Sequence, residues 1–219
     1  MSEISNSYSK QAKQYDDFIR KLVPIYDDVN NILPELITAP KKVLDIGSGT
    51  GNTAQVIQKK FPDADIICVD PTEGMLEIAK TKVTGRFICS DVENLEIDDT
   101  CCAVTSIMVM HNVQSVEKRQ EAYNKIYSCL KSGGVYISAD ILKGETEQTH
   151  KTYMKLWRDF MLKSLSEDDV DGKWIPLHQE KDKPVKLSEQ TSMLQKAGFK
   201  TVEIVLKNIN FALTAAYKD

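Results

Sequence analysis

Three glycines at alternate positions constrain the fold of this chain more than any other feature. Segment 43–52 reads Val-Leu-Asp-Ile-Gly-Ser-Gly-Thr-Gly-Asn, so an apolar strand runs into Gly47, Gly49 and Gly51. Glycine adopts backbone angles that other residues rarely reach and lets the main chain come within contact distance of a ligand. Between a strand and a helix, such a loop predicts a nucleotide-binding turn in an α/β fold.

The spacing of these glycines and the acidic residue before them indicate which nucleotide binds. A dinucleotide fold uses G-x-G-x-x-G, which seats a pyrophosphate at the helix N-terminus. Here the third glycine comes one residue early, and an aspartate precedes the loop. A carboxylate at that point repels phosphate and attracts a cationic amine. The combination favours S-adenosylmethionine, which carries an ammonium, a sulfonium and no phosphate. The expected contacts are Asp45, Gly47, Ser48, Gly49 and Gly51.

Strands and helices alternate after residue 41. Apolar runs predict strands over 43–46, 64–69, 85–89, 103–110 and 135–139, and helical spacing predicts helices over 52–61, 72–83 and 116–130. Repeated βα units with apolar strands predict a parallel sheet with helices on both faces. The chain then departs from this rhythm: a helix over 187–197 precedes strands at 201–206 and 211–216, which predict a terminal hairpin.

Two segments lie outside the repeat. Segments 8–22 and 25–36 are helical candidates, and 143–186 predicts one helix followed by a charged loop through Trp174 and Pro184. The 219 residues contain no internal repeat and fit one domain. We expect a helical cap at 1–40, a cofactor-binding core at 41–142, a lid-like insertion at 143–186 and a final helix with hairpin at 187–219.

The composition of the chain limits which cellular compartment and which classes of partner we expect. No apolar run approaches the ~20 residues needed to span a bilayer, and the first residues lack the basic and apolar regions of a signal peptide. We therefore expect a cytoplasmic protein with no membrane partner, acting as a monomer or homodimer. Five cysteines without C-x-x-C spacing predict reduced structural thiols, and no metal site is expected. The net charge of −4 argues against a dedicated nucleic-acid binder, although a local basic patch stays open.

Acidic residues end three consecutive predicted strands: Asp45, Asp70 and Asp91. One such aspartate is usually a turn or capping residue. Three beside a glycine loop predict a ligand site, because open sheets bind ligands beyond the carboxyl ends of their strands. We expect Asp70, which precedes Pro71, to accept hydrogen bonds from ribose hydroxyls, and Asp91 to hold the adenine amine with the amide of Val92 on the ring.

Two methionines and a histidine are candidates for the reacting centre. His111 is either a general base, since its ordinary pKa is nearest neutrality, or a loop residue that shapes the pocket. Of Met108 and Met110, one is expected at the sulfonium and the other in the core. Met75 either packs against the adenine or fills the core. His150 and His178 stand alone in the sequence pattern.

The insertion carries aromatic residues that either contact the methyl acceptor or fill the core. They are Tyr153, Trp157 and Trp174. Because methyl transfer from a sulfonium is an in-line displacement, the protein contributes alignment of the reactants and exclusion of water. A lid that carries large apolar side chains suits the second task.

These motifs resemble a known family. Segments 45–51 and 130–134, together with Val69-Asp70 and Ser90-Asp91, are similar to class I S-adenosylmethionine-dependent methyltransferases over about 41–139. The resemblance implies a Rossmann-like α/β fold: a mostly parallel seven-stranded sheet with a C-terminal antiparallel hairpin and helices on both faces. It also implies transfer of a methyl group from S-adenosyl-L-methionine to a small-molecule acceptor, with S-adenosyl-L-homocysteine as the product.

Segments outside that core resemble a narrower branch, the one that contains the carboxy-S-adenosylmethionine synthase of tRNA wobble-uridine modification. They are 18–26 (Phe-Ile-Arg-Lys-Leu-Val-Pro-Ile-Tyr), 194–199 (Leu-Gln-Lys-Ala-Gly-Phe) and Asn210-Phe211. The branch implies that Arg20 and Tyr26 help to close the pocket around cofactor and substrate.

The same branch implies extra cationic groups that hold the added carboxylate. No arginine lies between Gly172 and Gly198, where the related segment would supply one. Lys173 or Lys181 would have to substitute, and lysine does not reproduce a bidentate guanidinium contact. The sequence therefore favours unmodified S-adenosylmethionine.

Other functions stay open at this point. A carboxy-S-adenosylmethionine synthase-like enzyme or a tRNA-modification methyltransferase would use the same fold. A nicotinamide oxidoreductase would too, but the glycine spacing disfavours it. A non-catalytic cofactor-binding partner subunit is disfavoured by the intact cofactor residues and the lid.

Overall fold

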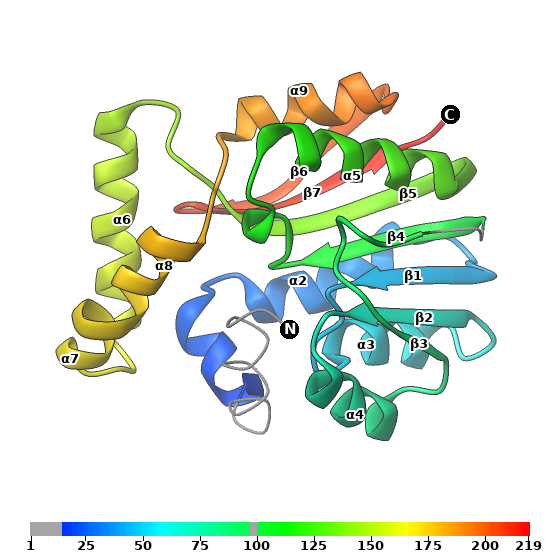
Figure 1. Ribbon diagram of the computed structural model, residues 1–219, viewed down its shortest axis with the longest axis horizontal. Coiled ribbons are helices and arrows are strands. Elements are labelled where there is room, and N and C mark those ends of the chain that lie inside the picture. The colour runs from blue at the N-terminus through cyan, green and yellow to red at the C-terminus, as the bar shows by residue number, and fades with distance from the viewer. Residues whose placement is uncertain (1–14, 97–99) are drawn as a thin grey trace.

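A computed structural model describes residues 15–96 and 100–219. Its centre is one seven-stranded sheet in the order β3-β2-β1-β4-β5-β7-β6 (Figure 1). The strands β1 to β5 are parallel, whereas β7 runs antiparallel to both β5 and β6. The predicted mostly parallel sheet with a terminal antiparallel hairpin is confirmed. The strands are β1 Lys42–Ile46, β2 Asp65–Asp70, β3 Arg86–Cys89, β4 Cys101–Ile107, β5 Leu130–Ile141, β6 Thr201–Asn208 and β7 Phe211–Tyr217.

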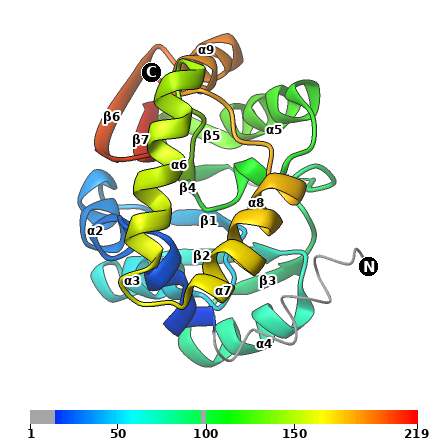
Figure 2. The ribbon, with the colours of Figure 1, turned by 90° about the vertical axis from the view of Figure 1, so that its left-hand side faces the viewer.

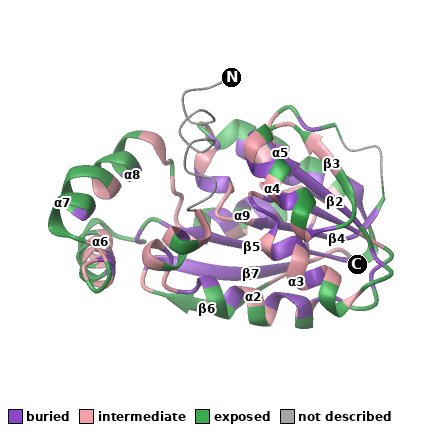
Figure 3. Cartoon of the chain, turned by 90° about the horizontal axis from the view of Figure 1, so that it is seen from below, coloured by how far each residue is buried: buried purple, intermediate pink, exposed green. Residues whose placement is uncertain are grey.

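Helices cover both faces of this sheet, as predicted. One face carries the helical residues 15–22 with α2, α3 and α4, and the other carries α5 and α9. The inner strands β1, β2, β4, β5 and β7 are mostly buried (Figure 3), whereas the edge strands β3 and β6 are partly exposed. The helices are α2 Tyr26–Ile32, η1 Leu33–Leu36, α3 Asn52–Lys60, α4 Glu73–Lys82, η2 Met110–Asn112, α5 Val116–Cys129, α6 Glu147–Met161, α7 Glu167–Asp169, η3 Val170–Trp174, α8 Ile175–Lys181 and α9 Leu187–Ala197.

The apolar runs of the strands follow from this two-sided burial. Successive side chains of a strand point to opposite faces, so Val43 of β1 joins one hydrophobic core and Leu44 the other. Ile66 and Ile67 of β2 divide between the two cores in the same way. A strand covered on both faces needs apolar residues at every position, which removes the polar alternation of a half-exposed strand.

The order of the strands reverses between β1 and β4. The chain moves outward from β1 to β3 and then returns to place β4 on the other side of β1. Two loops therefore meet above the carboxyl ends of these neighbouring strands, the glycine loop after β1 and the turn at Met108 after β4. Such a reversal is where open α/β sheets bind their ligands.

One predicted strand ends earlier than expected. The apolar run 103–110 predicts a strand throughout, but β4 ends at Ile107. Met108 adopts a φ of +59°, in the left-handed region that a strand cannot contain, and η2 begins at Met110.

The charged loop predicted through Trp174 and Pro184 is wrong as far as Lys181, because α7, η3 and α8 make that stretch helical. The Ser166 hydroxyl accepts the amide of Asp169 at 3.1 Å, and acidic residues fill the first turn, where they favour a helix. Arg158 of α6 donates a hydrogen bond to Asp171 at 2.6 Å, and this contact holds the segment formed by α7 and η3 against α6. Figure 2 shows α6, α7 and α8 together at one end of the sheet.

The helical candidates before the first strand are confirmed within the described residues. Residues 15–22 and α2 with η1 are helical, while 8–14 lie outside the described part of the chain. Trp157 of α6 donates its indole N–H to the carbonyl of Leu22 at 2.7 Å and so ties the insertion to the first helix. No helix in 15–96 or 100–219 has the length and apolar character that crossing a membrane requires.

Candidate functional site

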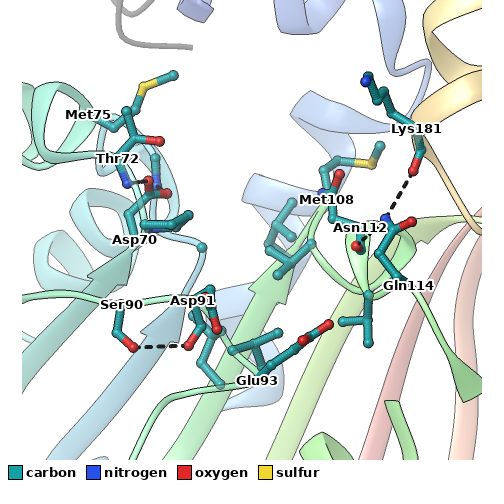
Figure 4. A pocket seen from close by; sticks show the side chains of 18 of the residues that line it. Asp70, Thr72, Met75, Ser90, Asp91, Glu93, Met108, Asn112, Gln114 and Lys181 are labelled. Atoms are coloured by element: carbon teal, nitrogen blue, oxygen red, sulfur yellow. Dashed lines mark hydrogen bonds between the residues drawn. The ribbon is translucent and has the colours of Figure 1, made fainter. Parts of the chain in front are cut away.

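A pocket of about 590 Å³ opens at the carboxyl ends of β1 to β4. Figure 4 shows Asp70, Thr72 and Met75 along one side and Met108 and Asn112 across from them. The residues at or directly after the ends of these four strands therefore line the same cavity. Its remaining walls come from the loop after β3 and from the end of α8.

The glycine loop has the conformation that its sequence predicts. Gly47, Gly49 and Gly51 have φ values of +65°, +53° and +83°, all in the left-handed region. A Cβ at Gly47 would lie 2.3 Å from Cγ2 of Val109, so this glycine allows the turn after β4 to pack against the loop. A Cβ at Gly49 would meet only Tyr15, at 4.0 Å, so this part of the loop is open to a ligand.

Asp70 holds the glycine loop and the turn after β2 in fixed positions. Its Oδ2 accepts the amide of Gly49 at 2.9 Å, and its Oδ1 accepts the amide of Thr72 at 2.8 Å. Burial raises the pKa of Asp70, and the two amide hydrogen bonds oppose that rise. Each carboxylate oxygen keeps further acceptor capacity, so ribose hydroxyls can bind without displacing the backbone.

Asp45 is buried under the glycine loop and lines neither pocket. Its Oδ1 accepts the Thr105 hydroxyl at 2.6 Å, and its Oδ2 has no hydrogen-bond partner among the described residues. Burial raises the pKa of Asp45 to about 7, opposed by Thr105 and reinforced by the charge of Asp70. The Ser48 hydroxyl is also buried without a partner in that part of the chain. Buried oxygens without a hydrogen-bond partner are costly, so a donor placed beside them would be stabilising.

We expect the affinity for S-adenosyl-L-homocysteine to rise as the pH increases through about 7. Asp45 must be ionised to attract an ammonium group, so binding releases a proton wherever the free carboxyl is protonated. Affinity should fall roughly tenfold for each pH unit below the pKa and level off above it. Calorimetry in buffers of different ionisation enthalpy measures the proton release, and Asp45→Asn should abolish it. If the affinity of the unmodified protein for S-adenosyl-L-homocysteine does not change with pH, Asp45 does not have this role.

A second pocket of about 470 Å³ adjoins the first. The two share Tyr15, Met108, Asn112, Glu180 and Lys181 as lining residues. The second pocket lies between residues 15–22, α8 and the end of β4, and its aromatic walls are Phe18, Trp157, Trp174 and Phe211. The insertion therefore covers a cavity that is continuous with the strand-end site.

Met108 stands where the two pockets meet. Its amide donates to the carbonyl of Ala139 at 2.7 Å, which pins the left-handed backbone. Non-glycine residues in this region carry strain of about 1–3 kcal/mol and cluster at functional sites. The fold holds this side chain at the junction at a cost in stability.

His111 lies in the wall of the second pocket between two carboxylates. Its Nδ1 bonds Asp140, whose other oxygen accepts the His111 amide at 3.1 Å. Its Nε2 is 3.9 Å from Oδ1 of Asp182 and 3.2 Å from the side-chain nitrogen of Asn112. Burial alone lowers the pKa of His111, but Asp140 and Asp182 outweigh it and raise that pKa above its ordinary value.

His178, which stands alone in the sequence pattern, is in fact part of this cluster. Its Nδ1 is 2.7 Å from Oδ2 of Asp182, and its ring meets Trp157 edge-on with 5.1 Å between centroids. The i,i+4 spacing of His178 and Asp182 was the available signal, because that spacing brings side chains together at a helix end.

The structure brings together most of the predicted site residues. Those that line the strand-end pocket are Gly47, Gly49, Asp70, Pro71, Met75, Asp91, Val92 and Met108. Those that line the second pocket are Met108, His111, Trp157 and Trp174.

Six predicted residues line neither pocket: Asp45, Ser48, Gly51, Arg20, Tyr26 and Tyr153. Ser48 and Tyr26 meet in a small recess on the far side of the glycine loop. Arg20 is exposed, pairs with Asp27 at 2.9 Å and lies 5.5 Å from the Tyr26 ring centre. The Tyr153 hydroxyl accepts Lys207 at 3.1 Å on the outer side of the insertion. Their functional roles stay predictions.

Sequence reasoning missed several lining residues. Tyr15 lines both pockets, and the side chain of Gln114 links the carbonyl of Asn112, at 2.8 Å, to that of Lys181, at 3.2 Å. No local pattern marks these residues, because tertiary contacts alone bring them from the first helix, the turn after β4 and the end of α8.

The strand order, the cavity at its reversal and the glycine loop with its acidic flank define a class I S-adenosylmethionine-dependent methyltransferase. A family model described as a methyltransferase domain matches residues 43–134. The carboxy-S-adenosyl-L-methionine synthase of Campylobacter jejuni is 30% identical over 95% of this chain and 92% of its own length.

Solved structures agree on the fold. A methyltransferase of Thermotoga maritima has a TM-score of 0.65 at 20% identity, over 97% of this chain and 98% of its own. Human N-acetylserotonin methyltransferase in complex with S-adenosylmethionine has a TM-score of 0.66 at 16% identity; the match covers 99% of this chain and 59% of that one.

The chain belongs to the class I S-adenosylmethionine-dependent methyltransferase family, in the branch that includes the carboxy-S-adenosyl-L-methionine synthases. It is an enzyme whose cofactor is S-adenosyl-L-methionine.

Proposed function

We propose that this enzyme transfers a methyl group from S-adenosylmethionine to a small-molecule acceptor bound in the second pocket. The junction at Met108 carries the proposal, because it joins a cavity of about 590 Å³ to one of about 470 Å³. In-line displacement needs the acceptor and the leaving sulfur on opposite sides of one carbon. Two adjoining pockets with Met108 at their junction support that alignment, which can contribute roughly 7–11 kcal/mol to lowering the barrier.

The cofactor would bind along the carboxyl ends of the strands. Asp45 with the glycine loop would hold the amino-acid tail, Asp70 the ribose, and Asp91 with the Val92 amide the adenine. Met75, buried in the same wall, would pack against the ring. Bound there, S-adenosylmethionine supplies an electrophilic methyl group on a positively charged sulfur.

The second pocket supports a flat, largely apolar acceptor. Four of its walls are aromatic side chains, and one group of polar residues in it is formed by His111, His178 and Asp182; Asn112, Lys173, Glu180 and Lys181 also line it. An acceptor ring would stack within the walls while its polar atom faces that group, and the lid would exclude water.

Turnover with a panel of small acceptors tests the proposal. Purified enzyme with S-adenosylmethionine and small phenols, amines, thiols or carboxylic acids should release S-adenosyl-L-homocysteine, and mass spectrometry should find the methylated product. Cofactor binding without turnover on any of these, or on tRNA, would identify a non-catalytic partner subunit. Binding of NAD in place of S-adenosylmethionine would refute the proposal.

A second candidate, carboxy-S-adenosylmethionine synthesis, is favoured by the 30% identity to a synthase over most of the chain. The positions of the four arginines disfavour it. Arg20 and Arg158 pair with surface acids, Arg86 is exposed, and Arg119 is buried against two backbone carbonyls. The lysine side chains in the second pocket that could hold a carboxylate are therefore those of Lys173 and Lys181.

Mass spectrometry of small molecules that copurify with the enzyme separates the two candidates. The methyltransferase should carry S-adenosylmethionine or its demethylated product. A carboxylated form, lost in a Lys173→Met, Lys181→Met double variant, would establish the synthase.

The proposal also covers the compartment, the oligomeric state and the domain organisation of the enzyme. All five cysteines are free thiols, which supports a reducing compartment, and we place the enzyme in the cytoplasm as a monomer or homodimer. All seven strands belong to one sheet, which supports a single domain over 1–219 with 1–40 as a cap and 143–186 as a lid. The net charge of −4 disfavours a tRNA acceptor.

A further inference from the structure

Four ionisable side chains form a row: His111, Asp182 and His178 line the second pocket, and Asp140 is buried behind His111. They come from η2, the segment after α8, α8 itself, and β5. Asp182 stands between the two histidines, with Oδ2 2.7 Å from Nδ1 of His178 and Oδ1 3.9 Å from Nε2 of His111. The row therefore gives His111 one carboxylate of its own, Asp140, and places Asp182 between the two histidines as a shared one.

The neighbours of His111 occupy both of its ring nitrogens. Asp140 takes Nδ1, while Asp182 and Asn112 face Nε2. The ring is 7% exposed, and the two carboxylates stabilise its protonated form. Arg119 is the cation that opposes them. A ring whose two nitrogens both face protein groups has no free lone pair to offer an acceptor.

His178 has one nitrogen engaged and one available. An ionised carboxylate only accepts hydrogen bonds, so the contact with Asp182 places the proton of the neutral ring on Nδ1 and leaves the lone pair on Nε2. The hydrogen bond at Nδ1 is the one that the ring makes to the described residues, and the ring lines the second pocket. Trp157 fixes the ring from the side, and the charged groups that face it are Asp182 and, from α6, His150.

We infer that His178, oriented by Asp182, takes the proton of the acceptor, and that the acceptor is a flat apolar molecule with a reactive O–H or N–H group. The inference deepens the proposed methyl transfer and rests on it. His111, the histidine that sequence reasoning selects, then acts as a positioning residue that fixes Asp182.

The step balances in atoms and charge. The acceptor oxygen or nitrogen forms a bond to the methyl carbon as the carbon–sulfur bond breaks, and sulfur keeps that electron pair. The acceptor proton passes to Nε2 of His178. The resulting imidazolium is stabilised by Asp182, as in other histidine–carboxylate pairs.

Nitrogen NMR of the histidine rings tests the inference without turnover. The chain has three histidines, so His→Gln variants assign every ring signal of the full chain bound to S-adenosyl-L-homocysteine. In the neutral His178 ring we expect the proton on Nδ1 and a bare Nε2. A proton on Nε2 of that ring, or a panel acceptor that shifts the nitrogen signals of His111 and leaves those of His178 unchanged, would overturn the inference. Absence of turnover with the acceptor panel would count against methyl transfer and leave this readout intact.

Kinetics on any panel acceptor that is methylated gives the second readout. His178→Gln should lower kcat by roughly 10²–10⁴, remove the acidic limb of the pH–rate profile and leave cofactor affinity unchanged. Lys155→Gln changes an exposed side chain of α6 that lines neither pocket, and it should leave kcat unchanged. Full activity in His178→Gln with loss of activity in His111→Gln would assign the base to His111 instead.

Discussion

Replacing Gly47 by alanine is expected to abolish cofactor binding and to lower the melting temperature by about 5–15 °C. The new Cβ would lie 2.3 Å from Cγ2 of Val109, a distance that real Cβ contacts do not reach. Gly47 also has a φ of +65°, where a side chain costs roughly 1–2 kcal/mol. Overpacking adds about 1–3 kcal/mol, and a chain of this size loses roughly 2–4 °C per kcal/mol.

The loss of binding follows from where the strain is relieved. Either the glycine loop or the turn at Met108 must move, and both line the strand-end pocket. Thermal unfolding and calorimetry with S-adenosyl-L-homocysteine measure the two effects. Gly172→Ala is the matched control, because a Cβ there meets nothing within 4 Å, and it should keep the affinity of the unmodified protein. Tight binding by Gly47→Ala would show that the loop is not part of the cofactor site.

The fold was predictable where local sequence decides the structure. The helix expected over 187–197 has those bounds, because the Glu189 carboxylate accepts the amide of Lys186 at 3.0 Å at its start and Gly198 ends it with a φ of +119°. The strand expected over 103–110 is too long by three residues. Met108 is as apolar as its neighbours, and only the turn it makes toward Ala139 takes it out of the strand.

The site divides in the same way. Part of the lining of the strand-end pocket was predictable, because Asp70 and Asp91 stand at the ends of strands that the sequence identifies. The row of His111, Asp182 and His178 was not, because these residues come together only after the insertion folds back over the sheet. The short helices of that insertion are too brief to show a helical period of apolar residues in the sequence. Their caps and ion pairs, such as Arg158 with Asp171, determine that these segments are helical.

Replacing Asp70 by asparagine should weaken binding of S-adenosyl-L-homocysteine by at least about a hundredfold. Each carboxylate oxygen accepts a backbone amide, from Gly49 at 2.9 Å and from Thr72 at 2.8 Å. Asparagine would turn an amino group toward one of these donors and remove an acceptor from the ribose. Hydrogen bonds to a charged group contribute about 1.5–3 kcal/mol each, and about 1.4 kcal/mol is a factor of ten in affinity.

Asp65→Asn is the control for this change, since Asp65 begins the same strand at its opposite end. Asp65 is exposed and lies 3.7 Å from Lys42, a surface pair worth roughly 0–1 kcal/mol. Calorimetry should therefore find its affinity close to that of the unmodified protein. If Asp70→Asn also binds normally, ribose is held elsewhere and the proposed orientation of the cofactor is wrong. If Asp70→Asn loses affinity while its melting temperature stays within a few degrees, the loss lies in recognition of the nucleoside, because a collapsed glycine loop would lower both.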